Sequence, residues 1–200
     1  MVTTRAVALG VFAIVALGGS NSAGGADQAN DKAVAESPKL ILDAQTGELT
    51  GVRVGMTAAQ VRALGYPTLA SSVMEEGERY PTMRVTIADG VELVALFAGE
   101  LLHRYTVTSP RVTTRLGSGV GTTWGELKQR YPDGRLLLGY EAGKHANFVS
   151  GSKVIIRLDM GQIDEVCFVD DLPRRAGKAS AECVADSVKV NSLVVDLHAN

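Results

Sequence analysis

Three short stretches contain residue types that could support chemistry. Residues 150–153 read Ser-Gly-Ser-Lys, the spacing of enzymes that use an activated serine. Residues 139–145 resemble a phosphate-binding loop, but they are one residue short between the glycines and place His145 where a magnesium-binding serine or threonine belongs. The glycines at 117–121 lack the third glycine of a dinucleotide fingerprint. We interpret all three stretches as turns and expect no catalytic residue and no cofactor.

The histidines and the acidic clusters do not suggest a metal site. His103, His145 and His198 occur singly, without the spacing that suits zinc. The acidic residues at 75–78 and 170–171 match no calcium loop. We expect solvated surfaces there, although a Ser/His/Asp triad formed only in three dimensions stays an alternative, since triads are recognised by geometry.

The two cysteines predict a disulfide. Cys167 and Cys183 are the only cysteines of the chain, and both follow a predicted export signal. An even pair in an oxidising compartment is typical of a bridge. Two buried free thiols and a metal-binding pair are the alternatives, and the second lacks neighbouring ligands.

The N-terminus has the pattern of a secretory signal peptide. Arg5 supplies a positive charge, residues 6–17 form an apolar run, and small and polar residues follow. The run is shorter than the roughly 20 apolar residues of a membrane-spanning helix, which favours a cleaved signal peptide over the alternative of an uncleaved anchor. We place the signal peptide at residues 1–23, with the cut between about 22 and 29, and a flexible leader at 24–38.

Composition limits the partners of the chain. Its formal net charge is −2, whereas nucleic-acid binding needs a clustered basic surface. No second apolar segment reaches spanning length. We therefore expect a periplasmic or secreted monomer that has no membrane span and binds no nucleic acid.

A helix with both ends marked is predicted after residue 56. Thr57 and Gln60 form a capping box, in which each side chain bonds the backbone N–H of the other residue. Glycine and proline at positions 65 and 67 end the helix. Val61 and Leu64 are predicted core residues.

The same pattern recurs after residue 122. Thr123 and Glu126 form a second capping box. Trp124, Leu127 and Tyr131 share one helical face and are predicted core residues. Two such patterns in the same order indicate an internal duplication.

Strand patterns follow each helix. An N-terminal hairpin is predicted first, and the C-terminal tail alternates as one further strand with a register break at 191–192. The predicted strands are 39–43, 48–54, 83–88, 91–97, 101–108, 136–140, 146–149, 154–158 and 162–169. The predicted fold class is α+β, with two tandem repeats that each pack a short helical segment on an antiparallel meander sheet.

These patterns divide the mature chain into three parts. The first repeat with its N-terminal hairpin covers residues 39–110, and the second repeat covers 111–170. Residues 171–200 form the C-terminal tail.

The first helix region also resembles a known repeat. The residues concerned are Gly55-Met56-Thr57-Ala58-Ala59-Gln60-Val61, followed by Gly65-Tyr66-Pro67. They resemble the family that contains the small lipoprotein of the outer-membrane β-barrel assembly machinery and the secreted β-lactamase inhibitor proteins. The resemblance covers residues 51–169 and implies a helical segment on an antiparallel sheet, twice in tandem in the inhibitors. The chain departs from the family because it lacks a lipidated N-terminal cysteine, a cysteine in the first repeat and an aromatic-rich sheet face.

The function predicted from these patterns is non-catalytic. We expect an exported interaction protein that recognises a protein or peptide through an exposed sheet face or the loops between repeats. A secreted inhibitor of a hydrolase, implied by the resemblance, and a small hydrolase with an unrecognised site are the alternatives.

Overall fold

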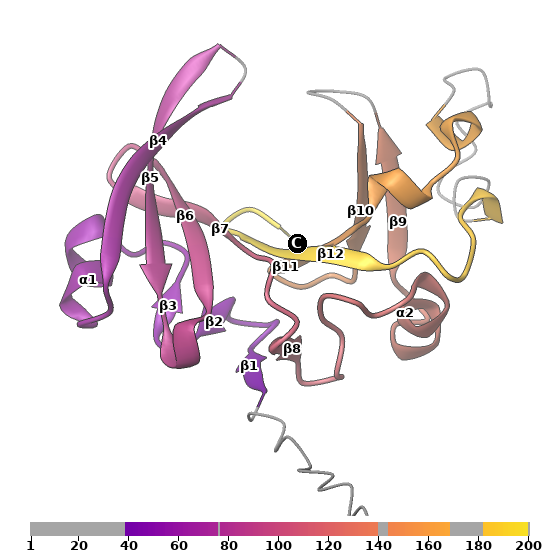
Figure 1. The fold of residues 1–200 in the computed structure, drawn as a ribbon, viewed down its shortest axis with the longest axis horizontal. Helices are drawn as coiled ribbons and strands as arrows, with labels where there is room; N and C mark the ends of the chain where they lie inside the picture. The colour runs from indigo at the N-terminus through magenta and orange to yellow at the C-terminus, as the bar shows by residue number, and fades with distance from the viewer. Residues whose placement is uncertain (1–38, 76, 140–143, 169–181, 200) are drawn as a thin grey trace, which may run out of the picture. The chain divides into compact units, whose positions relative to one another are not determined.

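A computed structural model describes residues 39–75, 77–139, 144–168 and 182–199 (Figure 1). These residues belong to one compact unit, Glu36–Asn200. The predicted signal peptide and leader lie outside the described residues. Within the described ranges, no helix is both long and apolar enough to cross a membrane.

An antiparallel sheet of eight strands makes up most of this unit. Its spatial order is β4-β5-β6-β7-β12-β11-β10-β9. The strands are β4 (Thr68–Glu75), β5 (Glu78–Thr86), β6 (Glu92–Ala98), β7 (Leu101–Val107), β9 (Arg135–Gly139), β10 (His145–Val149), β11 (Val154–Leu158) and β12 (Val190–Asp196).

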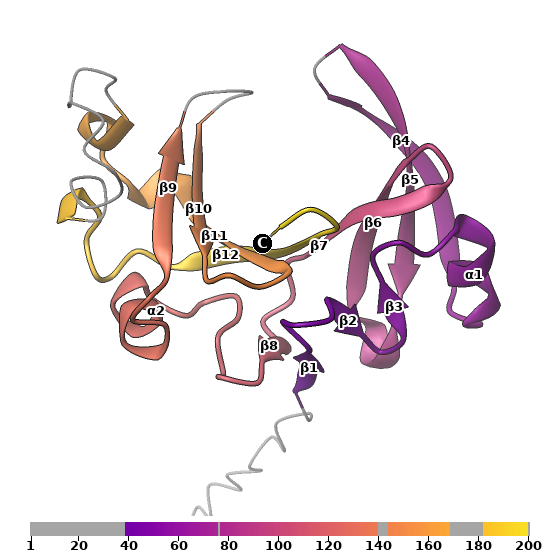
Figure 2. The same ribbon diagram turned by 180° about the vertical axis from the view of Figure 1, so that it is seen from behind.

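The most C-terminal strand of the described residues joins the two halves of the sheet. β12 pairs with β7 on one side, where Leu193 lies opposite Val107, and with β11 on the other, where Leu193 lies opposite Ile156. Figures 1 and 2 both show β12 running between these two strands. The four strands after α1 and the three after α2 therefore form one sheet and not two.

Short elements lie beside the sheet. β1 (Leu40–Leu42) pairs in parallel with β8 (Val112–Thr114), and β2 (Glu48–Leu49) pairs with β3 (Val52–Arg53). Gly47, in the turn before β2, has a φ of +65° and packs so closely on β12 that a Cβ would come within 2.6 Å of Val195 Cγ1. Only glycine fits this turn without strain.

Both helices are short and begin at a capping box. α1 (Ala58–Ala63) has Thr57 as its N-cap, with Thr57 Oγ1 accepting from Gln60 N. α2 (Trp124–Arg130) has Thr123 as its N-cap, and Glu126 Oε2 accepts from Thr123 N at 2.8 Å. The capping chemistry is local, which is why the sequence alone places the start of each helix.

The predicted α+β fold class is wrong. Strands make up 48% of the structure, and the two α-helices have only six and seven residues. Capping boxes mark where a helix begins, but they do not show how far it extends or how much sheet surrounds it. The prediction gave too much weight to the helices and did not anticipate a single continuous sheet.

Two segments differ from their predicted structure. β4 was not predicted, because Thr68–Glu75 shows no clear alternation and its side chains are largely exposed. The segment predicted as a strand at 162–169 contains two 3₁₀ turns, η2 (Met160–Gln162) and η3 (Glu165–Phe168). A further 3₁₀ turn, η1 (Ala88–Gly90), lies in the connection between β5 and β6, which the strands predicted at 83–88 and 91–97 imply.

The hydrophobic core lies on one face of the sheet. A row of cross-strand partners on this face is buried from β5 to β9, and it consists of Val85, Leu93, Val107, Leu193, Ile156, Phe148 and Leu136. The Trp124 ring meets the Phe148 ring edge-on, with centroids 5.6 Å apart. Val61 and Leu127 are fully buried beneath their helices.

Two other predicted core residues are only partly buried. Tyr131 packs against the core while its hydroxyl shares a 2.8 Å hydrogen bond with the Thr114 hydroxyl. Leu64 is not a core residue, because 36% of it is exposed. α1 ends at Ala63, so Leu64 lies past the inward face of the helix and its side chain covers Gly51 instead.

Candidate functional site

The sheet has a second face, opposite the core, which we call the open face. A continuous row of cross-strand partners crosses it on all eight strands, and the row consists of Leu69, Arg84, Val94, Thr106, Val194, Ile155, Val149 and Arg135. Successive side chains of a strand alternate between faces, so the residues two positions along from these also belong to the open face. The row is exposed at Leu69 on its outer strand, whereas Val194 on the central strand β12 is only 1% exposed.

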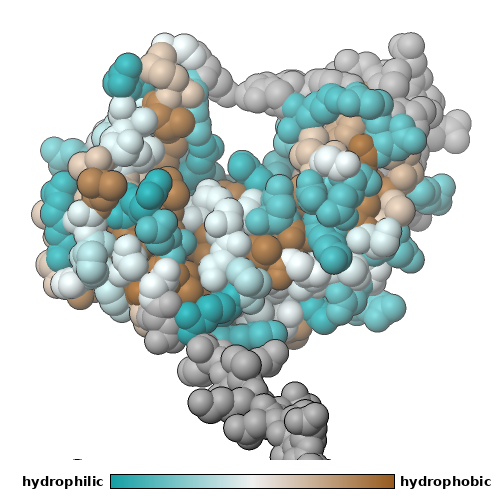
Figure 3. Space-filling view, viewed as in Figure 1, coloured by the Kyte–Doolittle hydropathy of each residue, from teal (hydrophilic) through white to brown (hydrophobic). Residues whose placement is uncertain are grey.

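Apolar residues are exposed on the open face. Leu69 is 63% exposed, and Val94 and Leu137 are each 45% exposed. Figure 3 shows hydrophobic and hydrophilic residues intermixed over the side that it views, without one dominant apolar patch. Such mixed surfaces are typical of non-obligate protein interfaces.

Ion pairs lie on the β4–β7 half of the open face. Arg104 on β7 forms an ion pair with Glu75 on β4. Arg84 and Glu92 lie 3.7 Å apart, with both side chains about half exposed. A surface pair of this kind adds little stability, so these pairs mainly set the local charge pattern.

A polar row crosses the other half of the open face. Asn147 on β10 lies directly opposite Arg157 on β11, and Arg157 lies opposite Ser192 on β12. Asn147 Oδ1 and Arg157 Nε are buried and have no hydrogen-bond partner in the described part of the chain. Burial lowers the pKa of the Arg157 guanidinium and the charge of Arg104 lowers it further, whereas Glu75 and Asp196 oppose the shift.

Sequence reasoning did not identify Arg157 or Asn147. The signal was present, because each is a polar residue between buried apolar neighbours in a short strand. That alternation places both on the face away from the core. Their position opposite each other depends on the pairing of β10 with β11, which the hydrophobic pattern does not specify residue by residue.

Two hollows lie elsewhere on the unit. One of about 460 Å³ lies between α1, the β4–β5 pair and the β6–β7 turn, with Ala58, Met83 and Phe97 in its wall. The other, of about 370 Å³, lies between the turn after β1 and the end of β8, where Asp43 and Arg115 form a 3.0 Å ion pair.

The described residues include all three histidines, and two of these lie near each other. His103 Nε2 is 3.9 Å from Asp196 Oδ2, and the His103 and His198 rings are 5.3 Å apart. In the described residues no hydrogen bond joins His103 to a serine. His145 lies apart from them, against Gly139. Groups of three or more His, Cys, Asp or Glu side chains that could hold a metal ion do not occur among the described residues.

The predicted cysteine pair is confirmed as a disulfide. Cys167 and Cys183 are bonded, with their Cα atoms 5.6 Å apart. Cys167 lies in η3 and not in a strand as predicted. Both sulfur atoms are used in this bond, so neither is a free nucleophile or metal ligand.

The structure places the three stretches whose residue types could support chemistry as follows. Residues 150–153 form the turn between β10 and β11, where Gly151 has a φ of +69°. Residues 117–121 lead into α2, and Gly119 lies against the carbonyl of Val112. The middle of 139–145 lies outside the described residues.

Comparison with known proteins gives little further guidance. No protein-family model matches the chain, and no curated protein matches it. The resemblance to the β-lactamase inhibitor and assembly lipoprotein family is therefore not confirmed. The crystal structure of the uncharacterized protein YfeY from Escherichia coli is similar, with 12% identity and a TM-score of 0.47 over 79% of this chain and 99% of that chain.

Proposed function

We propose that this chain is an exported, non-catalytic protein that binds a protein or peptide partner through the open face of its sheet. The observation that carries the proposal is the exposure of Leu69, Val94 and Leu137 on the face of the sheet opposite the core. Water-exposed apolar side chains beside ion pairs give a surface that can lose water on binding without leaving charges unpaired.

Two features support export. Residues 1–23 have the charged, apolar and small-residue regions of a signal peptide. The Cys167–Cys183 disulfide fits an oxidising compartment, such as the periplasm or the outside of the cell. An inhibitor of a secreted hydrolase is one form that such a partner-binding protein takes, and it is the form that the resemblance of residues 55–67 favours.

The test is capture of a partner that depends on the open face. The mature chain, tagged at its C-terminus, is cross-linked in envelope extract and the captured proteins are identified by mass spectrometry. The face variant is Val94→Arg with Leu137→Arg. The matched control is Ile41→Arg with Leu116→Arg, since both residues are more than half exposed but lie outside the large sheet.

The proposal expects one protein to be captured by the wild type and the control and lost with the face variant. Capture of nothing, or equal capture by all three chains, contradicts it. Far-ultraviolet circular dichroism of the three proteins verifies that the substitutions leave the sheet intact.

A further inference from the structure

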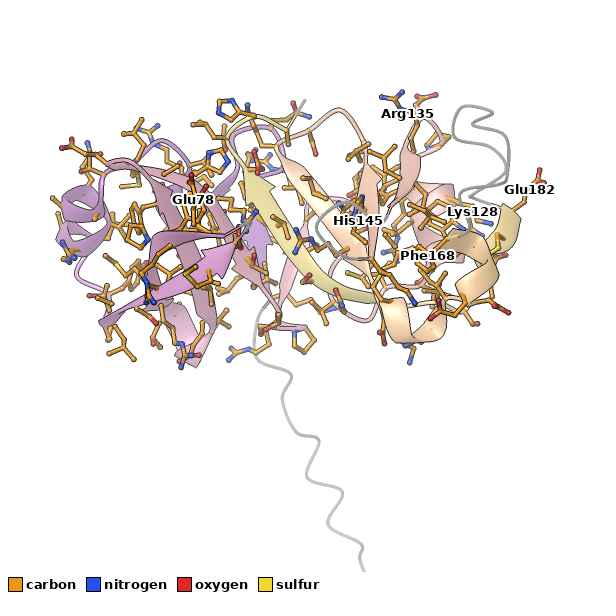
Figure 4. The ribbon with its side chains drawn as sticks, turned by 90° about the horizontal axis from the view of Figure 1, so that it is seen from above. Glu78, Lys128, Arg135, His145, Phe168 and Glu182 are labelled. Carbon is orange, nitrogen blue, oxygen red and sulfur yellow. A yellow bond between two sulfur atoms is a disulfide. The ribbon has the colours of Figure 1, made fainter. Side chains whose placement is uncertain are left out.

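Charge is distributed unevenly over the open face. The strands β4, β5 and β6 place Glu75, Glu78 and Glu92 on it. Strands β9, β10 and β11 contain no acidic residue at all, and they place Arg135 and Arg157 on it. Figure 4 shows Glu78 over the first group of strands and Arg135 and His145 over the second. The β9–β11 half therefore has an excess of positive charge.

Arg157 differs from the other charged residues in the middle of this face. Arg84, Arg104 and Asp196 each have an oppositely charged or protonatable partner within 4 Å. Arg157 makes no hydrogen bond or ion pair with any other described residue, and only its Nε is both buried and unpartnered. Its two terminal nitrogens therefore reach solvent with their hydrogen-bond donors free.

The residues around Arg157 favour ligand binding at its guanidinium group. Its Nε is buried, which restricts the conformations open to the stem of the side chain before binding. A pre-ordered side chain loses less conformational entropy when it binds. Asn147 lies opposite it, and an amide group can turn to present either its oxygen or its two donors. Leu137, next in the same row, offers an exposed apolar surface.

We infer that the β9–β11 half of the open face binds a carboxylate side chain of the partner, with Arg157 as the anchoring residue. This inference rests on the proposed partner-binding function and specifies its chemistry. The partner segment is acidic with an apolar neighbour, so that its carboxylate meets the Arg157 fork while the apolar side chain covers Leu137. A guanidinium binds a carboxylate through two parallel N–H···O bonds, and Asn147 can donate a third.

The experiment follows the arginine Nε–H resonances of the ¹⁵N-labelled mature chain by NMR. The probe is a synthetic peptide that repeats glutamate, valine and serine, and the matched peptide has glutamine in place of glutamate. The acidic peptide is expected to shift the Arg157 Nε–H signal, which is assigned by its loss in Arg157→Gln, whereas the glutamine peptide leaves it in place.

Three variants measure the contribution of the anchor. Arg157→Gln is expected to weaken binding of the acidic peptide about tenfold or more, because it removes hydrogen bonds to a charged group. Arg157→Lys keeps the positive charge but loses the paired N–H donors of the guanidinium. Its affinity for the acidic peptide is therefore expected to lie between those of the wild type and Arg157→Gln. Arg53→Gln, at an exposed residue outside the large sheet, binds like the wild type.

The inference is overturned by any of three results. These are equal shifts with both peptides, no shift with the acidic peptide, and unchanged affinity in Arg157→Gln. Thermal unfolding of Arg157→Gln shows whether a loss of binding reflects loss of structure, and the comparison of the two peptides needs no variant. Should Arg157→Gln still capture the envelope partner like the wild type, the carboxylate site is wrong while the partner-binding function stands.

Discussion

Leu127 and Thr123 hold α2 in different ways, and removing them should cost different amounts of stability. Leu127 is fully buried, and emptying a buried leucine site costs about 2–5 kcal/mol. Thr123 caps the first turn, and loss of an N-cap costs about 1 kcal/mol. We expect Leu127→Ala to lower the urea midpoint more than Thr123→Ala, with the exposed Gln129→Ala close to wild type. If Leu127→Ala matches Gln129→Ala, α2 does not pack on the core as described.

The capping box of α2 should also make stability depend on pH. Hydrogen bonds from the backbone and the hydroxyl of Thr123 hold the pKa of Glu126 below its usual 4.5, and Arg130 lowers it further. A carboxylate whose pKa is lowered by folding stabilises the fold fully above its unfolded pKa, and this contribution is lost as the pH falls through the folded pKa. Glu126→Gln should therefore unfold at a lower temperature than wild type at neutral pH, and the two midpoints should converge in acid. A difference that stays constant from neutral to acidic pH contradicts this assignment.

Among the elements, β12 contains an irregularity with a testable consequence. Arg157 pairs with Ser192 and Leu158 pairs with Val190, which leaves Asn191 as the extra residue of a β-bulge. Deleting Asn191 makes the pairing regular and keeps Val190 on the core face. Deleting Val194 instead moves Leu193 to the open face, since a one-residue shift reverses every side chain.

The two deletions should differ in stability by roughly the burial of one or two large aliphatic side chains, about 1.5–3 kcal/mol each. Guanidinium unfolding of both variants measures the difference. Equal midpoints for the two deletions would show that Asn191 is not a removable bulge residue.

The elements also show how far the sequence could predict the structure. The capping boxes at Thr57 and Thr123 were predictable because their chemistry acts over four residues. The break at 191–192 was visible because the apolar alternation changes phase there. β4 was not predictable, since its largely exposed residues are held by pairing with β5 and leave no burial pattern.

The candidate site was less predictable than the elements. Arg157 and Asn147 become neighbours only when β10 pairs with β11, and the hydrophobic pattern of a short strand does not specify the pairing of single residues. The pairing of β7 with β12 joins segments that are far apart in the chain, so no local pattern indicates it.

For the whole molecule, one continuous sheet predicts one cooperative unfolding transition. β12 pairs with both β7 and β11. If β12 unfolds, the inner edge strand of each half of the sheet loses its hydrogen-bonded neighbour. The only tryptophan, Trp124, reports on the α2 side, while far-ultraviolet circular dichroism reports on all strands. We expect the two urea curves to coincide, and Val195→Asp to lower both midpoints together. Two separated transitions would show that the halves fold independently.

The place of β12 also determines when the sheet can form during synthesis. Among the described strands it is the last to be synthesised, yet it fills a position in the middle of the sheet between β7 and β11. Contacts between distant parts of a chain form slowly, because a long loop must close first. Until the C-terminal residues are made, the earlier strands have no complete sheet to join. For a chain that is exported as proposed, we expect this strand order to delay completion of the sheet until the chain has crossed the membrane.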